Sequence, residues 1–89
     1  MFRTNYTSGL NALILSGTEA EQRWAAAAKE LLVELGINLP VLIADGHRVS
    51  LIELLKLSTD KELIKVLDST DRYTELSFLA DQYNLTLER

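Results

Sequence analysis

The pattern of apolar and polar positions predicts one long amphipathic helix between Thr18 and Gly36. Thr18 lies three residues before Glu21, the spacing of a capping box, in which each side chain bonds the other residue's backbone N–H. Gly36 follows the last periodic residue, where many helices end in a left-handed glycine. One arc of the helix collects most of the apolar side chains, namely Ala20, Trp24, Ala27, Ala28, Leu31 and Leu35, with Ala25 and Leu32 at its edge.

Trp24 is the largest apolar side chain of this helix, and it precedes four consecutive alanines, Ala25–Ala28. A tryptophan beside small residues could line a ligand pocket. Core packing is the preferred interpretation, because burying an aromatic side chain removes about 150–250 Å² from water.

The first 17 residues predict a second, shorter helix. Apolar side chains recur there at helical spacing, at Phe2, Tyr6, Leu10, Leu13 and Ile14. We expect the helix to begin between Asn5 and Ser8 and to end at Gly17. A strand over residues 11–16 is the competing interpretation, since Gly9 weakens a helix by about 1 kcal/mol relative to alanine.

Residues 41–49 predict a short β-hairpin. Two β-rich runs, 41–43 and 47–49, flank Asp45-Gly46, the residue pair typical of a type I′ turn. Pro40 precedes the first run, which is compatible with an edge strand. The alternative is a single helical turn from Pro40 to Asp45, ended by Gly46.

Three further helices are expected at about 51–57, 60–68 and 71–83. Ser50 with Glu53 and Thr59 with Glu62 have the capping-box spacing. The apolar face changes phase at residues 58–60, which favours two short helices over one long one. The predicted buried positions are Leu63, Val66 and Leu67 in the second helix and Tyr73, Leu76, Leu79, Ala80 and Tyr83 in the third. Asn84 is a candidate left-handed C-cap, followed by a short tail over residues 85–89.

These elements define a mainly α fold, a single-domain bundle over residues 1–89 with four or five helices and one short hairpin near 41–49. So short a chain buries only about 60–65% of its unfolded surface. With 47% hydrophobic residues, it must either pack efficiently or cover surface against a partner.

Composition excludes several kinds of chemistry. The chain has no cysteine and one histidine, and it lacks the carboxylate spacing of an EF-hand, so we expect neither a metal nor a cofactor. The net charge of −4 argues against nucleic acid as the main ligand. No run approaches the roughly 20 apolar residues that span a bilayer, and no signal peptide is evident, so a cytoplasmic protein is expected.

Two local motifs suggest chemistry but have simpler explanations. His47 and Arg48 lie near Asp45, yet only Ser50 is a nearby nucleophile and no oxyanion-hole signature accompanies it, so we predict no catalytic residues. Residues 79–86 resemble the second helix and turn of a helix-turn-helix, in which a recognition helix must follow. The sequence ends at Arg89, so we attribute the match to ordinary helix-end chemistry.

Phe78 is the strongest candidate for a partner contact. It lies opposite the apolar arc of the last helix, on the face with Asp71, Glu75 and Gln82, and Val33 has a similar place on the long helix. The alternative is that a neighbouring segment, such as the N-terminus, covers Phe78. We therefore expect a non-enzymatic protein-interaction module, an adaptor, regulator or stoichiometric inhibitor that binds another protein or a second copy of itself. A dimeric nucleic-acid-binding regulator is the alternative.

Overall fold

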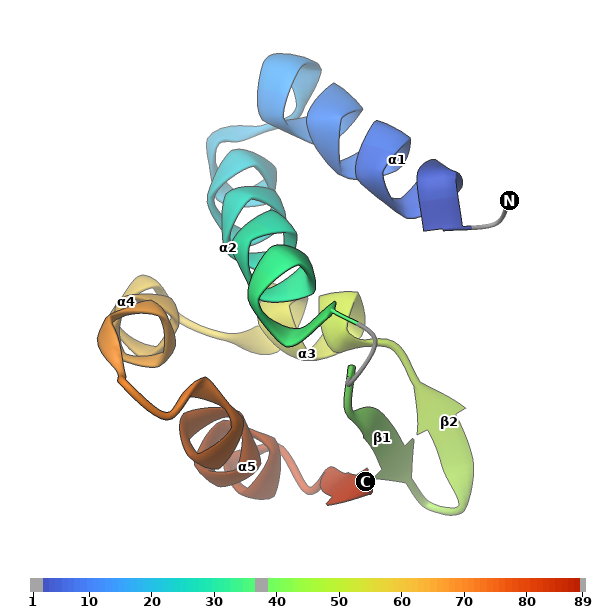
Figure 1. Ribbon diagram of the computed structural model, residues 1–89, viewed down its shortest axis with the longest axis vertical. Helices are drawn as coiled ribbons and strands as arrows, with labels where there is room; N and C mark the ends of the chain where they lie inside the picture. The colour runs from blue at the N-terminus through green and yellow to red at the C-terminus, as the bar shows by residue number, and fades with distance from the viewer. Residues whose placement is uncertain (1–2, 37–38, 89) are drawn as a thin grey trace.

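The computed structural model describes residues 3–36 and 39–88 and confirms the mainly α fold class. Figure 1 shows helices that lead from α1 at one end of the molecule to a small antiparallel sheet at the other. The helices are α1 (Arg3–Ser16), α2 (Glu19–Leu35), α3 (Leu51–Leu57), α4 (Asp60–Asp68) and α5 (Arg72–Gln82). The strands are β1 (Val41–Ala44), β2 (His47–Val49) and β3 (Thr86–Glu88).

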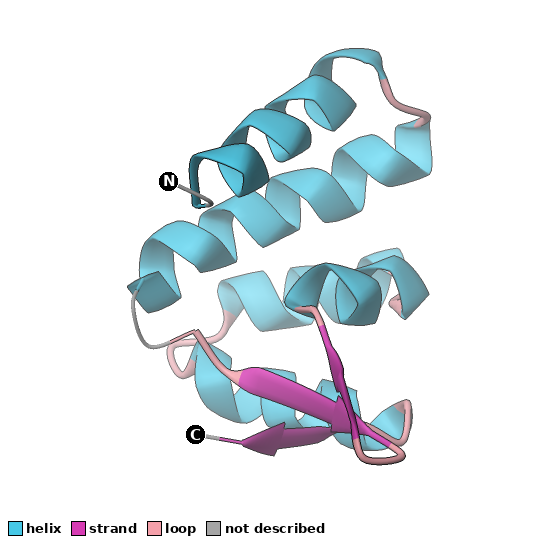
Figure 2. Cartoon of the chain, turned by 90° about the vertical axis from the view of Figure 1, so that its right-hand side faces the viewer, coloured by secondary structure: helices cyan, strands magenta, loops and turns pink. Residues whose placement is uncertain are grey.

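Helix α2 lies between α1 on one side and α3 and α4 on the other, and α5 packs beside α4 and against β3. Figure 2 shows this as successive layers, with the sheet at the opposite end of the molecule from α1. The buried side chains of all these layers belong to one hydrophobic cluster. The elements therefore share a single core, of which α2 is the central helix.

The capping box of α2 forms as predicted. Thr18 N donates to Glu21 Oε1 at 2.9 Å, and Glu21 N donates to Thr18 Oγ1 at 3.2 Å. Gly36 ends the helix with φ 54° and ψ −128°. The positive φ agrees with the prediction, but the ψ value lies outside the left-handed helical region, in a conformation that almost only glycine adopts.

The predicted buried arc of α2 needs two corrections. Ala25, placed at its edge, is fully buried. Helix α1 packs against α2, and Lys29, one turn after Ala25, donates to Asn11 Oδ1 of α1 at 2.8 Å. Ala20, placed on the arc, is exposed. Arg23 bonds Asp60, the first residue of α4. Ala20 lies about one turn before Arg23 on α2. The buried arc is wider than predicted because α2 has neighbours on two sides.

Helix α1 confirms the helical interpretation of the N-terminal pattern, although it begins at Arg3 rather than between Asn5 and Ser8. Leu10 is buried, and Leu13 and Ile14 pack against the core. Phe2 and the side chain of Tyr6 lie outside the described part of the chain. The helix ends where predicted, since a Cβ at Gly17 would lie 2.6 Å from Leu13 O, too close for any other residue without rearrangement.

The hairpin and its type I′ turn are confirmed. Asp45 and Gly46 have φ values of 50° and 79°, as a type I′ turn requires. Leu42 pairs with Val49, and Ala44 with His47. The edge position with which Pro40 is compatible is not the one that β1 takes, because β3 pairs with its other side and the strand order is β2-β1-β3. Pro40 is tolerated because it precedes the first paired residue.

The remaining helices have the expected bounds to within a residue at each end. Thr59 and Glu62 form a complete capping box, whereas Ser50 caps α3 through its side chain alone. Leu63 and Val66 on α4 are buried as predicted, and so are Leu76, Leu79 and Ala80 on α5. The other predicted positions are only partly buried, namely Leu67, Tyr73 and Tyr83.

The segment after α5 differs from the predicted tail. Asn84 has φ 59°, as expected of a left-handed C-cap. Leu85 N donates to Ala80 O at 2.8 Å and Asn84 N donates to Asp81 O at 3.1 Å, the two bonds of a Schellman motif. This turn buries Leu85 and directs residues 86–88 into β3, where Leu87 pairs with Leu42.

Candidate interaction surface

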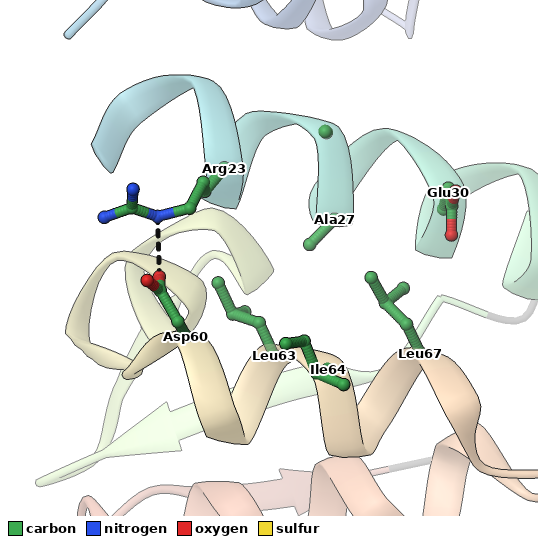
Figure 3. A pocket seen from close by; sticks show the side chains of 8 residues that line it. Arg23, Ala27, Glu30, Asp60, Leu63, Ile64 and Leu67 are labelled. Carbon is green, nitrogen blue, oxygen red and sulfur yellow. Dashed lines mark hydrogen bonds and ion pairs between the residues drawn. The ribbon is translucent and has the colours of Figure 1, made fainter. Parts of the chain in front are cut away.

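An apolar groove separates α2 from α4. Its volume is about 330 Å³. Figure 3 shows the two helices running side by side with their side chains facing the groove. The lining residues are Arg23, Ala26, Ala27 and Glu30 from α2 and Asp60, Leu63, Ile64 and Leu67 from α4.

The groove exists because α2 presents small side chains where α4 presents large ones. Ala26 and Ala27 have only a Cβ to offer, so the space between the helices is not filled from the α2 side. Leu63 is buried at 6% exposure, whereas Ile64 is 58% exposed. An exposed isoleucine beside a groove leaves apolar surface in contact with water, which burial against another molecule would relieve.

Charged side chains lie at both ends of the groove. Arg23 Nε donates to Asp60 Oδ1 at 2.7 Å, and Arg23 Nη1 lies 3.8 Å from Glu19 Oε1. Glu30 lies at the other end, near Leu67 in Figure 3. The side chains of Arg23 and Asp60 are each about half exposed, so this pair adds little stability. Because Asp60 and Glu19 both lie beside Arg23, its positive charge is compensated at this end, and Glu30 adds a negative charge at the other.

A second, smaller cleft of about 30 Å³ lies on the opposite side of α4, between α4 and α5. Phe78, 61% exposed, lines it together with Glu75 and Gln82. The structure thus brings three of the predicted contact residues together. The alternative in which another segment covers Phe78 does not hold at this exposure.

A hydrogen bond joins α4 to the end of α5 beside this cleft. Tyr83 Oη donates to Glu62 Oε1 at 2.7 Å, and Thr59 N donates to the same oxygen at 2.8 Å. The Thr59 N–H and then the Tyr83 hydroxyl lower the pKa of Glu62. The same bond raises the pKa of Tyr83. The Glu62 carboxylate therefore connects the start of α4 to the end of α5.

The other two predicted contact residues lie elsewhere. Asp71 is the N-cap of α5, where its side chain accepts from Thr74 N. Val33 is 80% exposed on α2 and lines a shallow depression with Lys29, Glu30, Glu34 and Arg72. Because Glu30 lines both this depression and the groove, Val33 continues the α2–α4 surface rather than the Phe78 cleft.

Sequence reasoning missed Ile64 and Ala26 as surface features. The only available signal was the position of Ile64 about 100° from Leu63 on the helical wheel, outside the predicted buried face. An alanine pattern alone does not show whether a neighbour fills the space beside it.

Other candidates from the sequence have structural explanations. Trp24 is 7% exposed and belongs to the core, with Lys56 Nζ 5.3 Å from the ring centroid. His47 and Arg48 are both exposed on β2. Residues 86–88 form β3, so the described chain after Asn84 holds a strand where a helix-turn-helix has its recognition helix.

Within residues 3–36 and 39–88, no group of three or more histidine, aspartate and glutamate side chains is arranged to hold a metal ion. No helix in the same ranges has the length and apolar character needed to cross a membrane. The fold therefore defines a small, mainly helical domain with a three-stranded sheet. No protein-family model, curated protein or solved structure matches the chain.

Proposed function

We propose that this protein is a non-enzymatic protein-interaction module that binds its partner through the surface formed by α2 and α4. The observation that carries the proposal is the groove of about 330 Å³ between these helices. Its wall includes Ile64, which is 58% exposed. An apolar cleft with charged ends is the form of site that accepts one face of an amphipathic helix.

The exposed apolar side chains near the groove support the same proposal. Val33 extends the surface along α2, and Phe78 lies on the far side of α4, in the α4–α5 cleft. Aromatic and aliphatic side chains inside a rim of charges are typical of the contact residues that dominate binding energy. A partner that covers α4 would contact both sides. As the sequence suggests, we place this activity in the cytoplasm, which fractionation of cells that express the full chain would test.

Site-specific photo-cross-linking tests the proposal. A photoreactive phenylalanine analogue replaces Ile64 in the full chain, and in a matched control it replaces Leu57, which is 56% exposed on α3. We expect a discrete adduct from position 64 and none of the same mass from position 57. Adding Ala26→Glu, which places a charge in the groove, should remove the adduct.

The outcome against the proposal is equally specific. The groove is not the binding surface if both positions give the same adducts, if position 64 gives none, or if Ala26→Glu leaves the adduct unchanged. A circular dichroism melt of each variant tests whether the fold is retained. We expect it to be, since positions 26, 57 and 64 are all exposed.

A further inference from the structure

The walls of the α2–α4 groove are α-helices that present apolar side chains. Ala26 and Ile64 are exposed there, and Leu67 is partly buried. Over most of the groove, the backbone N–H and C=O groups of both walls are bonded within their own helices. An extended peptide would therefore find almost no backbone groups with which to pair. A segment that binds here has to satisfy its own backbone hydrogen bonds, as an α-helix does.

The groove has the length of two helical turns. It runs from Arg23 to Glu30 on α2 and from Asp60 to Leu67 on α4. A separation of seven residues corresponds to about 10 Å along each helix axis. The two helices run in the same direction, because Arg23 bonds Asp60 at one end and Glu30 lies near Leu67 at the other (Figure 3). A helix laid in the groove can therefore place apolar side chains at positions i, i+3 and i+7 against it.

The Arg23 end of the groove carries no net charge. Arg23 Nε lies 2.7 Å from Asp60 Oδ1, and Arg23 Nη1 lies 3.8 Å from Glu19 Oε1. Lys61 follows Asp60 and is exposed. Two acidic and two basic side chains therefore balance at this end.

The Glu30 end carries negative charge that nothing compensates. Glu30 and Asp68 are exposed, and neither forms an ion pair within residues 3–36 and 39–88. Asp68 is the last residue of α4, where the helix dipole disfavours a carboxylate. The nearest lysines in the sequence are directed elsewhere, since Lys29 donates to Asn11 of α1 and Lys65 lines the α4–α5 cleft.

We infer that the groove between α2 and α4 binds a two-turn segment of amphipathic α-helix that carries a lysine or arginine at the end beside Glu30. This inference rests on the proposed function and gives the chemistry of the partner. The apolar face of the bound helix covers Ile64, and its cation compensates Glu30 and Asp68. Uncharged or acidic ends do not supply that compensation.

Synthetic peptides test this chemistry. The probe has about 18 residues and is rich in alanine so that it forms a helix. It carries leucines at positions i, i+3 and i+7 and a lysine beyond each end of the leucine stripe. One matched peptide has glutamates in place of the lysines, and the other has alanines in place of the leucines. In isothermal titration calorimetry with the full chain, the lysine peptide should bind saturably below about 1 mM, and each matched peptide should bind about tenfold more weakly.

Charge variants of the protein separate a local cation site from attraction to the net charge of −4. Glu30→Gln and Asp68→Asn each remove one negative charge at the proposed cation end. Glu19→Gln removes the same charge at the balanced end of α2. We expect the first two variants to bind the lysine peptide about threefold more weakly and the third to bind it nearly as the wild type does. All three positions are exposed, and thermal melts check that the fold is retained.

Nuclear magnetic resonance of the isotope-labelled full chain locates the bound peptide. Backbone amide shifts should change most at Ala26, Ile64 and Leu67 and little at Phe78, which lines the separate α4–α5 cleft. Ala26→Glu, which places a carboxylate in the groove wall, should abolish the shifts.

Four results would overturn the inference: no saturable binding of the lysine peptide below about 1 mM, equal affinity for the lysine and glutamate peptides, equal effects of Glu30→Gln and Glu19→Gln, or shifts centred on Phe78. They are distinguishable from failure of the proposed function. If the peptides fail while position 64 still gives a photo-adduct that Ala26→Glu removes, the groove is an interaction surface and only the helix with a basic end is wrong. An adduct with twice the mass of this chain would identify a second copy as the partner and would likewise overturn the inference.

Discussion

Replacing Trp24 with alanine should remove a large part of the stability of this protein. The side chain is 7% exposed, so almost all of its surface contributes to the core. Burial of about 150–250 Å² at about 25 cal/mol per Å² gives an upper limit of about 4–6 kcal/mol. Measured truncations of large core aromatics give about 3–5 kcal/mol, and we expect Trp24→Ala to fall in that range.

The contact with Lys56 is a separate and smaller contribution. Its Nζ lies 5.3 Å from the Trp24 ring centroid, but the lysine side chain is 47% exposed and also lies near Glu53. A cation–π contact at such a site contributes about 0.5–1 kcal/mol. Lys56→Met should therefore lower stability by no more than about 1 kcal/mol, and this variant distinguishes loss of the cation from loss of the ring.

Urea unfolding followed by far-ultraviolet circular dichroism is the appropriate assay, because Trp24 is the only tryptophan and its fluorescence disappears with it. A domain of this size has a total stability of about 4–13 kcal/mol, so a loss of about 3–5 kcal/mol should lower the urea midpoint of Trp24→Ala well below that of the wild type. Trp24→Phe, which keeps most of the apolar volume, should stay folded with a smaller loss. A loss below about 1 kcal/mol for Trp24→Ala would contradict the packing described above.

Three further predictions concern the turn, the α4–α5 cleft and pH. Gly46→Val should cost about 1–2 kcal/mol in urea unfolding, because Gly46 has φ 79° and a β-branched residue resists that conformation. Gly46→Asn should cost less, and equal stability of both variants would count against the type I′ turn. Phe78→Ser should leave the melting temperature unchanged and weaken partner binding or self-association in ultracentrifugation; a variant that unfolds would place Phe78 in the core. The pKa of Glu62 is lowered by the Thr59 N–H and then by Tyr83, so the stability it contributes is present above its ordinary pKa of 4.5 and is lost as the pH falls through the folded value. The pKa of Tyr83 is raised, so its contribution is present below 10.0 and lost above that pH; Tyr83→Phe should make stability less dependent on pH at both ends, which urea midpoints across the pH range would measure.

The amino-acid sequence determined the features that depend on neighbouring residues. Thr18 and Glu21, like Thr59 and Glu62, are three residues apart, so a helix start could be recognised without knowing what surrounds it. The Asp45-Gly46 turn is equally local, because both residues tolerate positive φ. Helical periodicity likewise identified most of the buried residues on α2, α4 and α5.

Tertiary structure decided the features that depend on residues far apart in the chain. Residues 86–88 are too few to show strand periodicity, and they become β3 only because the turn at Asn84 brings them beside β1, more than 40 residues earlier. That pairing also made β1 the central strand. Ala25 is fully buried, one turn before Lys29, which bonds Asn11 of α1.

In the candidate site, too, some features follow from the sequence and others only from the tertiary structure. The sequence could place Phe78 outside the buried arc of its helix, together with Glu75 and Gln82, because those positions follow from helical geometry alone. It could not indicate the groove, since Ala26 and Ala27 leave a hollow only where α4 lies beside them. A small side chain leaves a cavity only where the side chains packed beside it do not fill the space, and the folded structure determines which side chains those are.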